Sequence, residues 1–350
     1  MPSEKIPPRE IKSIIEERYL LLVQDIQAVS GGNITEKHHL ITDQGQYLLR
    51  VRHGFFRPRD LAADHAFLDH LAQNRLPVPG LVETKGGTTF FAHEGKFFAL
   101  QEYLEHDQTL EDVVYHDLAP DLFDLLGRFH QTSNNYQETI RKPPYLGNTR
   151  VPIGHDEKYF LGPQKYGASR FREAAETLAP GQRKAFQNQI RYFMDTLKRI
   201  FPEYQQACQV GPLLINHNDF YGNNILFQGG EIVGIVDFDF CHTGLYAVDL
   251  IEALHGAMIW HEEESRYLGM TAEGDVRLEK GLESLSQYFT HNPDFPRDGR
   301  LLINMLIVKL ISLAFYPAFD FWQNIPDKQE GFVRLKKVIH NLEEIHSLEL

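Results

Sequence analysis

Cysteine is almost absent from this chain: only Cys208 and Cys241 occur among its 350 residues. Two cysteines cannot form the disulfide framework of a small secreted scaffold, so we expect a reducing, cytoplasmic location. The N-terminal residues lack the apolar core of a secretory signal. The most membrane-like stretch, 301–319, contains Lys309, which would lie inside the bilayer. We therefore expect a buried helix there and no attachment to a membrane.

Positive charge is also scarce. The chain has 35 Lys and Arg against 48 Asp and Glu, which gives a formal net charge of −13. Such a chain repels nucleic acid and anionic membranes, so proteins that bind along a phosphate backbone are excluded. An anionic ligand would have to be held by local groups such as loop amides, single arginines or bridging cations. The charge balance favours a cationic substrate.

The remaining composition is that of a folded globular protein, with 42% apolar and 24% charged residues. The length corresponds to about two domains, or to one large protein with two lobes. No internal repeat or low-complexity tract is visible.

The first third of the chain predicts an antiparallel sheet with one inserted helix, after a short N-terminal helix. Apolar periodicity and Gly-bearing turns distinguish the two kinds of element. The expected helices are 10–22 and 59–74, and the expected strands are 25–29, 36–42, 47–52, 88–92 and 97–103.

The rest of the chain predicts helices interrupted by one β-hairpin. Helix-period patterns cover 118–132, 171–178, 181–201 and the region beyond 245, whereas 213–240 contains two apolar strands around a Gly-Gly turn. The fold class is therefore α+β with two lobes. We expect a β-rich lobe at 1–104 and a mainly helical lobe at 105–350, which carries the hairpin.

The hairpin region concentrates oxygen-bearing side chains. Asp219 and Asn224 lie five residues apart on the loop that precedes the hairpin, and Asp237 follows its second strand. Folding at the Gly-Gly turn returns Asp237 beside Asn224, and such oxygen ligands suit Mg²⁺ with phosphate. Asp219 is left to accept a proton from a hydroxyl. The alternative is that Asp and Asn are simply favoured in turns.

This pattern resembles the catalytic core of kinases, and most closely the aminoglycoside phosphotransferase and choline kinase superfamily. The resemblance rests on His-Asn-Asp at 217–219, Asn224, and Val-Asp-Phe at 236–238, and extends over residues 25–255. It implies a bilobal protein-kinase-like fold, with a nucleotide-binding lobe at 1–104 and with the catalytic loop and the acceptor site in the lobe at 105–350. It implies ATP as co-substrate and Mg²⁺ as cofactor. It also implies transfer of the γ-phosphate to a hydroxyl of an amino alcohol, an amino sugar or an amino acid such as homoserine.

The resemblance also assigns roles. Asp219 is similar to the catalytic base, Asn224 and Asp237 to the metal ligands, Asp249 to the helix aspartate that braces the loop, and His217 to a scaffold residue of that loop.

Two positions depart from the superfamily pattern. Arg50 replaces the usual lysine of the third strand, and Asp64 replaces the usual glutamate of the following helix. The longer cation and the shorter acid are expected to compensate and to form a pair; an exposed surface ion pair is the alternative. Arg52 is the other candidate cation, and we expect it on the opposite face of the strand.

The remaining nucleotide contacts are expected from loops and backbone. Ser30, Gly31 and Gly32 occupy the position of a phosphate-covering loop, where glycines let backbone amides approach anionic oxygens. Gln101 and Tyr103 lie on the strand that corresponds to the adenine-binding hinge.

Two other functions stay open. A protein kinase is disfavoured because only eleven residues separate Asp237 from Asp249 and no Ala-Pro-Glu follows. A kinase-like binding or structural protein without turnover is the other alternative. For the acceptor, the run Glu262, Glu263 and Glu264 could attract an ammonium group, or could be a solvated helix end.

Overall fold

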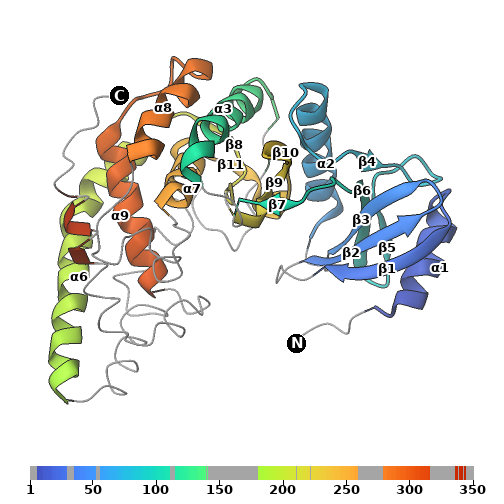
Figure 1. Ribbon diagram of the computed structural model, residues 1–350, viewed down its shortest axis with the longest axis horizontal. Helices are drawn as coiled ribbons and strands as arrows, with labels where there is room; N and C mark the ends of the chain where they lie inside the picture. The colour runs from blue at the N-terminus through green and yellow to red at the C-terminus, as the bar shows by residue number, and fades with distance from the viewer. Residues whose placement is uncertain are drawn as a thin grey trace. The chain divides into compact units, whose positions relative to one another are not determined.

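The structure is a computed structural model (Figure 1). It describes residues 6–29, 35–52, 56–110, 115–138, 140, 180–209, 211–220, 222–258, 279–315, 336, 337, 339–341 and 343. The chain divides into two compact units. The first is Met1–Thr109 with Asn224–Phe238, and the second is Leu110–Asn223 with Asp239–Leu350. The hairpin thus groups with the N-terminal residues, and the domain boundary near 104 stays a prediction.

The N-terminal unit is built on a six-stranded antiparallel sheet, with the order β1-β2-β3-β6-β4 and with β5 paired to β6. The predicted strands are present, although only the last part of 88–92 is extended. The short β4 was not predicted, since two residues show no periodicity. The bounds are β1 Val23–Val29, β2 Thr35–Thr42, β3 Gly45–Arg52, β4 Leu81–Val82, β5 Phe91–His93 and β6 Lys96–Glu102.

Two helices accompany this sheet, α1 at Pro8–Arg18 and α2 at Pro58–Gln73. The apolar positions of α1, Ile11, Ile14 and Ile15, share one buried core with alternate positions of β3, Leu49 and Val51. Residues two apart on a strand share a face. The side chains between these core positions, which include Arg50, therefore lie on the other face of the sheet.

The hairpin of the N-terminal unit consists of β9 Ile225–Gln228 and β10 Glu231–Ile235. Gly229 and Gly230 both have positive φ, 59° and 88°, which suits a two-residue turn of the primed kind. A short unpredicted strand, β7 at Gln108–Thr109, pairs with β9 and completes a three-stranded sheet.

The C-terminal unit is mainly helical, with one two-stranded ladder of β8 Leu213–Asn216 and β11 His242–Leu245. The helix α3 packs against α7 and α8, and α9 packs against α6 and α7. The predicted helix 171–178 lies outside the described residues. The helices are α3 Tyr115–Asn134, α6 Pro180–Cys208, α7 Ala247–Met258, α8 Glu279–His291 and α9 Gly299–Phe315.

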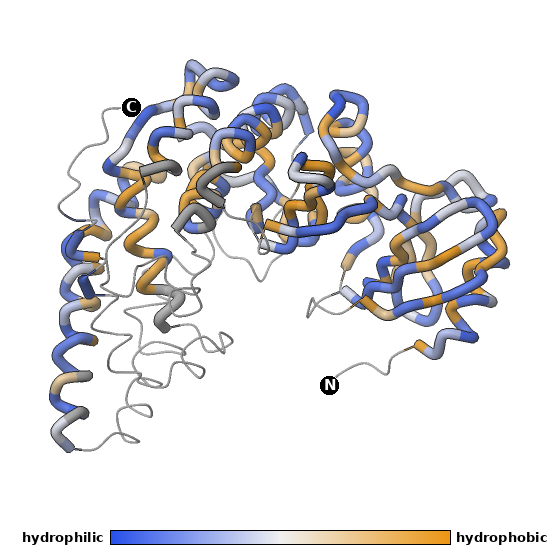
Figure 2. Tube along the Cα trace, viewed as in Figure 1, coloured by the Kyte–Doolittle hydropathy of each residue, from blue (hydrophilic) through white to orange (hydrophobic). Residues whose placement is uncertain are grey.

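The apolar stretch near the C-terminus forms α9, which Figure 2 shows largely in the hydrophobic colour. The side chains described from Leu301 to Ile311 are buried, apart from the partly buried Lys309. Lys309 lies 2.6 Å from both carboxylate oxygens of Glu252 on α7, which explains how a cation is accommodated here. Among the described residues, no helix is long and apolar enough to cross a bilayer.

His65 on α2 provides a pH-dependent contribution to stability. Its ring is buried and its Nδ1 lies 2.7 Å from the Thr89 hydroxyl. Burial, followed by the charges of Arg52 and Arg50, lowers the pKa of His65 from 6.5 to about 3. The unfolded chain therefore takes up this proton first, and stability falls as the pH drops below about 6.5.

We expect His65→Gln to reduce the stability that is lost between pH 7 and pH 5, by about 2 kcal/mol relative to wild type. Denaturant unfolding at the two pH values measures this difference. His70→Gln, a partly exposed position on the same helix, is the control for the same substitution outside the core. An equal pH dependence in His65→Gln would show that His65 is protonated in the folded protein.

Candidate active site

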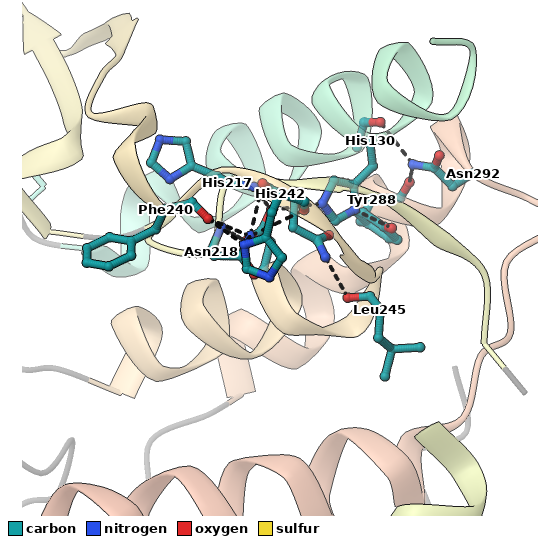
Figure 3. Close-up of polar contacts among 11 residues, drawn as sticks. His130, His217, Asn218, Phe240, His242, Leu245, Tyr288 and Asn292 are labelled. Atoms are coloured by element: carbon teal, nitrogen blue, oxygen red, sulfur yellow. Dashed lines mark hydrogen bonds and ion pairs between the residues drawn. The ribbon is translucent and has the colours of Figure 1, made fainter. Parts of the chain in front are cut away.

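The loop that carries Asp219 begins where β8 ends. Figure 3 shows the polar contacts of Asn218 in this loop with Phe240 and His242. Asn216 is paired with His242 across the β8–β11 ladder, and its side-chain amide donates to the Leu245 carbonyl at 2.8 Å. Asn218 has φ 64°, a left-handed conformation that Asn tolerates better than most residues. Its side-chain amide lies 3.1 Å from both the Asn216 and Phe240 carbonyl oxygens. These bonds hold the turn immediately before Asp219.

Asp249, on α7, fixes the backbone of the same loop. Its Oδ2 accepts from the amide of His217 and its Oδ1 from the amide of Asn218, both at 2.7 Å. The carboxylate is fully buried, so these charge-assisted hydrogen bonds are not weakened by water. The bracing role that the resemblance implied for Asp249 is therefore present as a pair of backbone contacts.

Two residues that the sequence did not single out extend the contacts of Asp249: His130 contacts Asp249, and Tyr288 contacts His130. His130 on α3 places Nε2 3.1 Å from Asp249 Oδ2 and Nδ1 2.8 Å from the Tyr288 hydroxyl on α8. Burial raises the pKa of Tyr288 well above its ordinary value, so its hydroxyl keeps the proton. These contacts extend the polar network of Asp249 from α7 to α3 and α8.

Close packing of α3 and α8 makes this chain of contacts possible. A Cβ on Gly127 would come within 3.0 Å of the Tyr288 carbonyl oxygen, and the Asn292 amide donates to the Gly127 carbonyl at 2.9 Å. His130 lies three residues beyond Gly127, one helical turn along α3, and so reaches Tyr288.

Asp219 itself is partly exposed, between a pinned backbone and the fully buried Phe220. His217 is also fully buried, and its ring contacts those of Phe129 and Phe220. An apolar, aromatic environment suits a scaffold residue better than a proton donor, as the sequence indicated. The loop thus presents one accessible carboxylate on a fixed backbone.

A second cluster lies within the N-terminal unit. Asp237, at the end of the hairpin, receives two cations: Lys37 Nζ is 2.6 Å from Oδ2, and Arg50 Nη2 is 2.7 Å from Oδ1. Lys37 on β2 and Arg50 on β3 are directly opposite each other in the ladder. The sequence predicted Arg50 and Asp237 for this site, whereas Lys37 was missed.

The donor set around Asp237 is compatible with a divalent cation. The amide of Val236 donates to the Asn224 carbonyl at 3.0 Å, so the backbones on either side of the hairpin are adjacent. The Asp237 side chain keeps 19% of its surface exposed. A carboxylate with a neighbouring side-chain amide is the hard oxygen chemistry that Mg²⁺ prefers.

Arg52 corrects one expectation. Being two residues from Arg50, it shares that residue's face of β3, and the prediction of opposite faces was wrong. Both arginines are buried, and both lower the pKa of His65. Arg52 also lies over the Phe56 ring, with its guanidinium carbon 5.9 Å from the centroid. The pairing of Arg50 with Asp64, which is partly buried on α2, stays a prediction.

The hinge strand is present as β6 and its continuation. Gln101 is buried, and the amide of Tyr103 donates to the Gln46 carbonyl at 3.2 Å. The Tyr103 ring stacks on that of His39, with centroids 4.0 Å apart. Adenine pairing along this strand stays a prediction. The expected phosphate loop, Ser30, Gly31 and Gly32, and the acidic run 262–264 lie outside the described residues.

Comparison with known proteins gives one family match. A family described as "Phosphotransferase enzyme family" matches residues 25–285. A homoserine kinase of Zymomonas mobilis subsp. mobilis is 22% identical over 225 residues, which are 64% of this chain and 62% of that protein. The matches to this and two further homoserine kinases span only 62% to 63% of those proteins' own lengths.

Two solved structures share the fold. A microcompartment-associated aminopropanol kinase has a TM-score of 0.60 at 16% identity, over 96% of each chain. An amicoumacin kinase in complex with AMP-PNP and Ca²⁺ has a TM-score of 0.57 at 15% identity, over 98% of this chain and 95% of the other. These TM-scores show a common fold, the protein-kinase-like α+β fold that the sequence predicted. At such low identities the likeness shows the fold alone.

Proposed function

Because the chain belongs to the phosphotransferase enzyme family, we propose that it is a kinase of small molecules, which moves the γ-phosphate of ATP to a substrate hydroxyl. The observation that carries this proposal is the anchored loop before Asp219. Both backbone amides preceding it are held by the buried carboxylate of Asp249. A base must keep a fixed position to take a hydroxyl proton, and this loop supplies it.

In this proposal Asp219 orients the acceptor hydroxyl and accepts its proton as the oxygen attacks phosphorus. Arg50 stabilises negative charge on the phosphates. Asp237 and Asn224 would hold Mg²⁺, which neutralises phosphate charge when bound. Ser30, Gly31 and Gly32 would cover the phosphates, Asp64 would aim the cation, and Gln101 and Tyr103 would border the adenine.

Homoserine is the first acceptor to test, since three similar proteins are named homoserine kinase. An amino alcohol is the second, by the likeness to an aminopropanol kinase. The amino alcohol is a net cation, which fits the net charge of −13, whereas homoserine carries an ammonium group and a carboxylate together.

An assay of ADP formation over a panel of acceptors tests the proposal. The panel should contain homoserine, aminopropanol, choline and an aminoglycoside, together with uncharged alcohols of equal length. Phosphorus NMR then identifies the phosphorylated product. ADP formation that never exceeds the acceptor-free rate, together with no thermal stabilisation by nucleotide, would instead support a binding protein without turnover.

Asp237→Asn tests the metal site. A neutral amide is a poorer ligand than a carboxylate, so we expect ADP affinity in the presence of Mg²⁺ to fall about tenfold, or ~1.4 kcal/mol. ADP affinity in EDTA should change much less. Isothermal titration calorimetry measures both.

Asp69→Asn is the matched control, because it removes the same charge from the exposed face of α2, where Asp69 contacts Gln73. It should bind Mg²⁺ and ADP as wild type does. If Asp237→Asn retains both the nucleotide affinity and its metal dependence, Asp237 is not a metal ligand.

A further inference from the structure

Lys37 occupies a position whose function the family resemblance did not predict. It projects from β2 toward the same carboxylate as Arg50 on β3, and the two residues are direct partners in the ladder. Each oxygen of Asp237 accepts from a different cation, Oδ2 from Lys37 and Oδ1 from Arg50. One carboxylate is therefore shared by two cations that belong to neighbouring strands.

The burial of this cluster makes its charge important. The exposed fraction of the side chain is 14% for Lys37, 2% for Arg50 and 19% for Asp237. Lys37 and Arg50 place two positive charges beside one carboxylate, in a poorly solvated place. A divalent cation added at Asp237 would bring two more positive charges beside them, which is unfavourable where water screens little.

A polyphosphate removes this difficulty. Its negative charges neutralise the metal and both side chains together, so metal and nucleotide should bind as a unit. Lys37 is the member able to move: its ammonium sits on a flexible stem with three donors, whereas the guanidinium of Arg50 is almost fully buried. A small displacement would transfer Lys37 from the carboxylate to a phosphate oxygen.

We infer that Lys37 is a positioning residue with two alternative partners. Without nucleotide it pairs with Asp237 and competes with metal for that carboxylate. With nucleotide it binds a phosphate oxygen beside Arg50 and leaves Asp237 to the metal. This inference rests on the proposed function and adds to it a physical cause for cooperative binding of metal and nucleotide.

Lys37→Met keeps the apolar stem and removes the charge. It should strengthen metal binding without nucleotide and weaken nucleotide binding, so the two effects of Lys37 can be told apart. The affinity for Mn²⁺ without nucleotide, measured by electron paramagnetic resonance of the free ion, should become about threefold tighter or more, since the competing cation is gone. Binding of ADP in the presence of Mn²⁺ should weaken about tenfold, since a phosphate contact is gone.

Lys12→Met is the matched control, since Lys12 is a half-exposed lysine of α1 that pairs with Glu16 in the same unit. It should leave both affinities as in wild type. Lys37→Arg keeps the charge, and should keep most of the increase in Mn²⁺ affinity that ADP produces. Thermal unfolding of each variant shows whether it is folded at the assay temperature.

The inference is overturned if Lys37→Met binds Mn²⁺ without nucleotide no more tightly than wild type does, or if its affinity for ADP with Mn²⁺ is unchanged. Failure of the proposed function looks different: wild type would then bind no ADP and show no ADP-dependent gain in Mn²⁺ affinity. The nucleotide-free Mn²⁺ measurement decides the competition at Asp237 in either case.

Discussion

Asp219→Asn should abolish phosphate transfer almost completely while nucleotide binding persists. The amide cannot accept a proton from the acceptor hydroxyl, and general-base catalysis of this kind contributes a factor of about 10²–10⁴ in rate. The loop should keep its shape, because the backbone amides of His217 and Asn218 stay bound to the Asp249 carboxylate. ADP formation with the best acceptor measures kcat, and calorimetry measures the affinity for ADP with Mg²⁺.

The control is Asp294→Asn, an exposed carboxylate of the same unit, which should leave kcat and ADP affinity unaltered. If Asp219→Asn keeps more than about a tenth of the wild-type kcat, a loss below ~1.4 kcal/mol, then another group is the base. If it loses ADP binding instead, Asp219 contributes to the nucleotide site.

Asp249→Ala should give the largest loss of stability among the substitutions considered. It leaves one buried and one partly buried backbone amide without the carboxylate acceptor, and it removes the Asp249 contact of His130. Breaking such a buried charged network costs about 3–5 kcal/mol. For a unit of this size the midpoint of thermal unfolding should fall by about 10 °C. Differential scanning calorimetry measures this shift.

Asp249→Asn refines the same test. The two loop amides donate to different oxygens of Asp249, and Asn replaces one of these oxygens by an NH₂ group, so its stability should lie between Ala and wild type. Nucleotide binding at a temperature where Asp249→Asn is folded should survive, whereas kcat should fall because the backbone before Asp219 is held by one bond in place of two. A variant with normal stability and normal kcat would show that the loop does not depend on Asp249.

The sequence predicted the parts of the site that follow one another along the chain. Asp219, Asn224 and Asp237 were predicted because a hairpin places its two ends together, which needs only local periodicity and one turn. Asp249 and Arg50 were predicted through the resemblance.

The missed residues depend on contacts between distant segments. Lys37 lies 200 residues from Asp237, and a lysine on an early strand ordinarily indicates a solvated edge. Its partnership with Arg50 requires the register of β2 against β3, which the sequence pattern left open. His130 and Tyr288 are separated by 158 residues on two amphipathic helices, where each is indistinguishable from an ordinary core residue. Short strands such as β7 are equally invisible, because two residues carry no period.

The grouping of the hairpin with the N-terminal residues has a consequence for fragments of this protein. The polypeptide passes from one compact unit to the other three times, after Thr109, after Asn223 and after Phe238. A single proteolytic cut, or a single premature stop codon, therefore cannot produce either unit intact. A fragment ending near residue 104 would lack both β7 and the β9–β10 hairpin, and Lys37 and Arg50 would lose their shared carboxylate. A fragment that contains the whole N-terminal unit needs residues 224–238 joined to 1–109 by a new linker. If this fragment folds correctly, Lys37 and Arg50 again pair with Asp237.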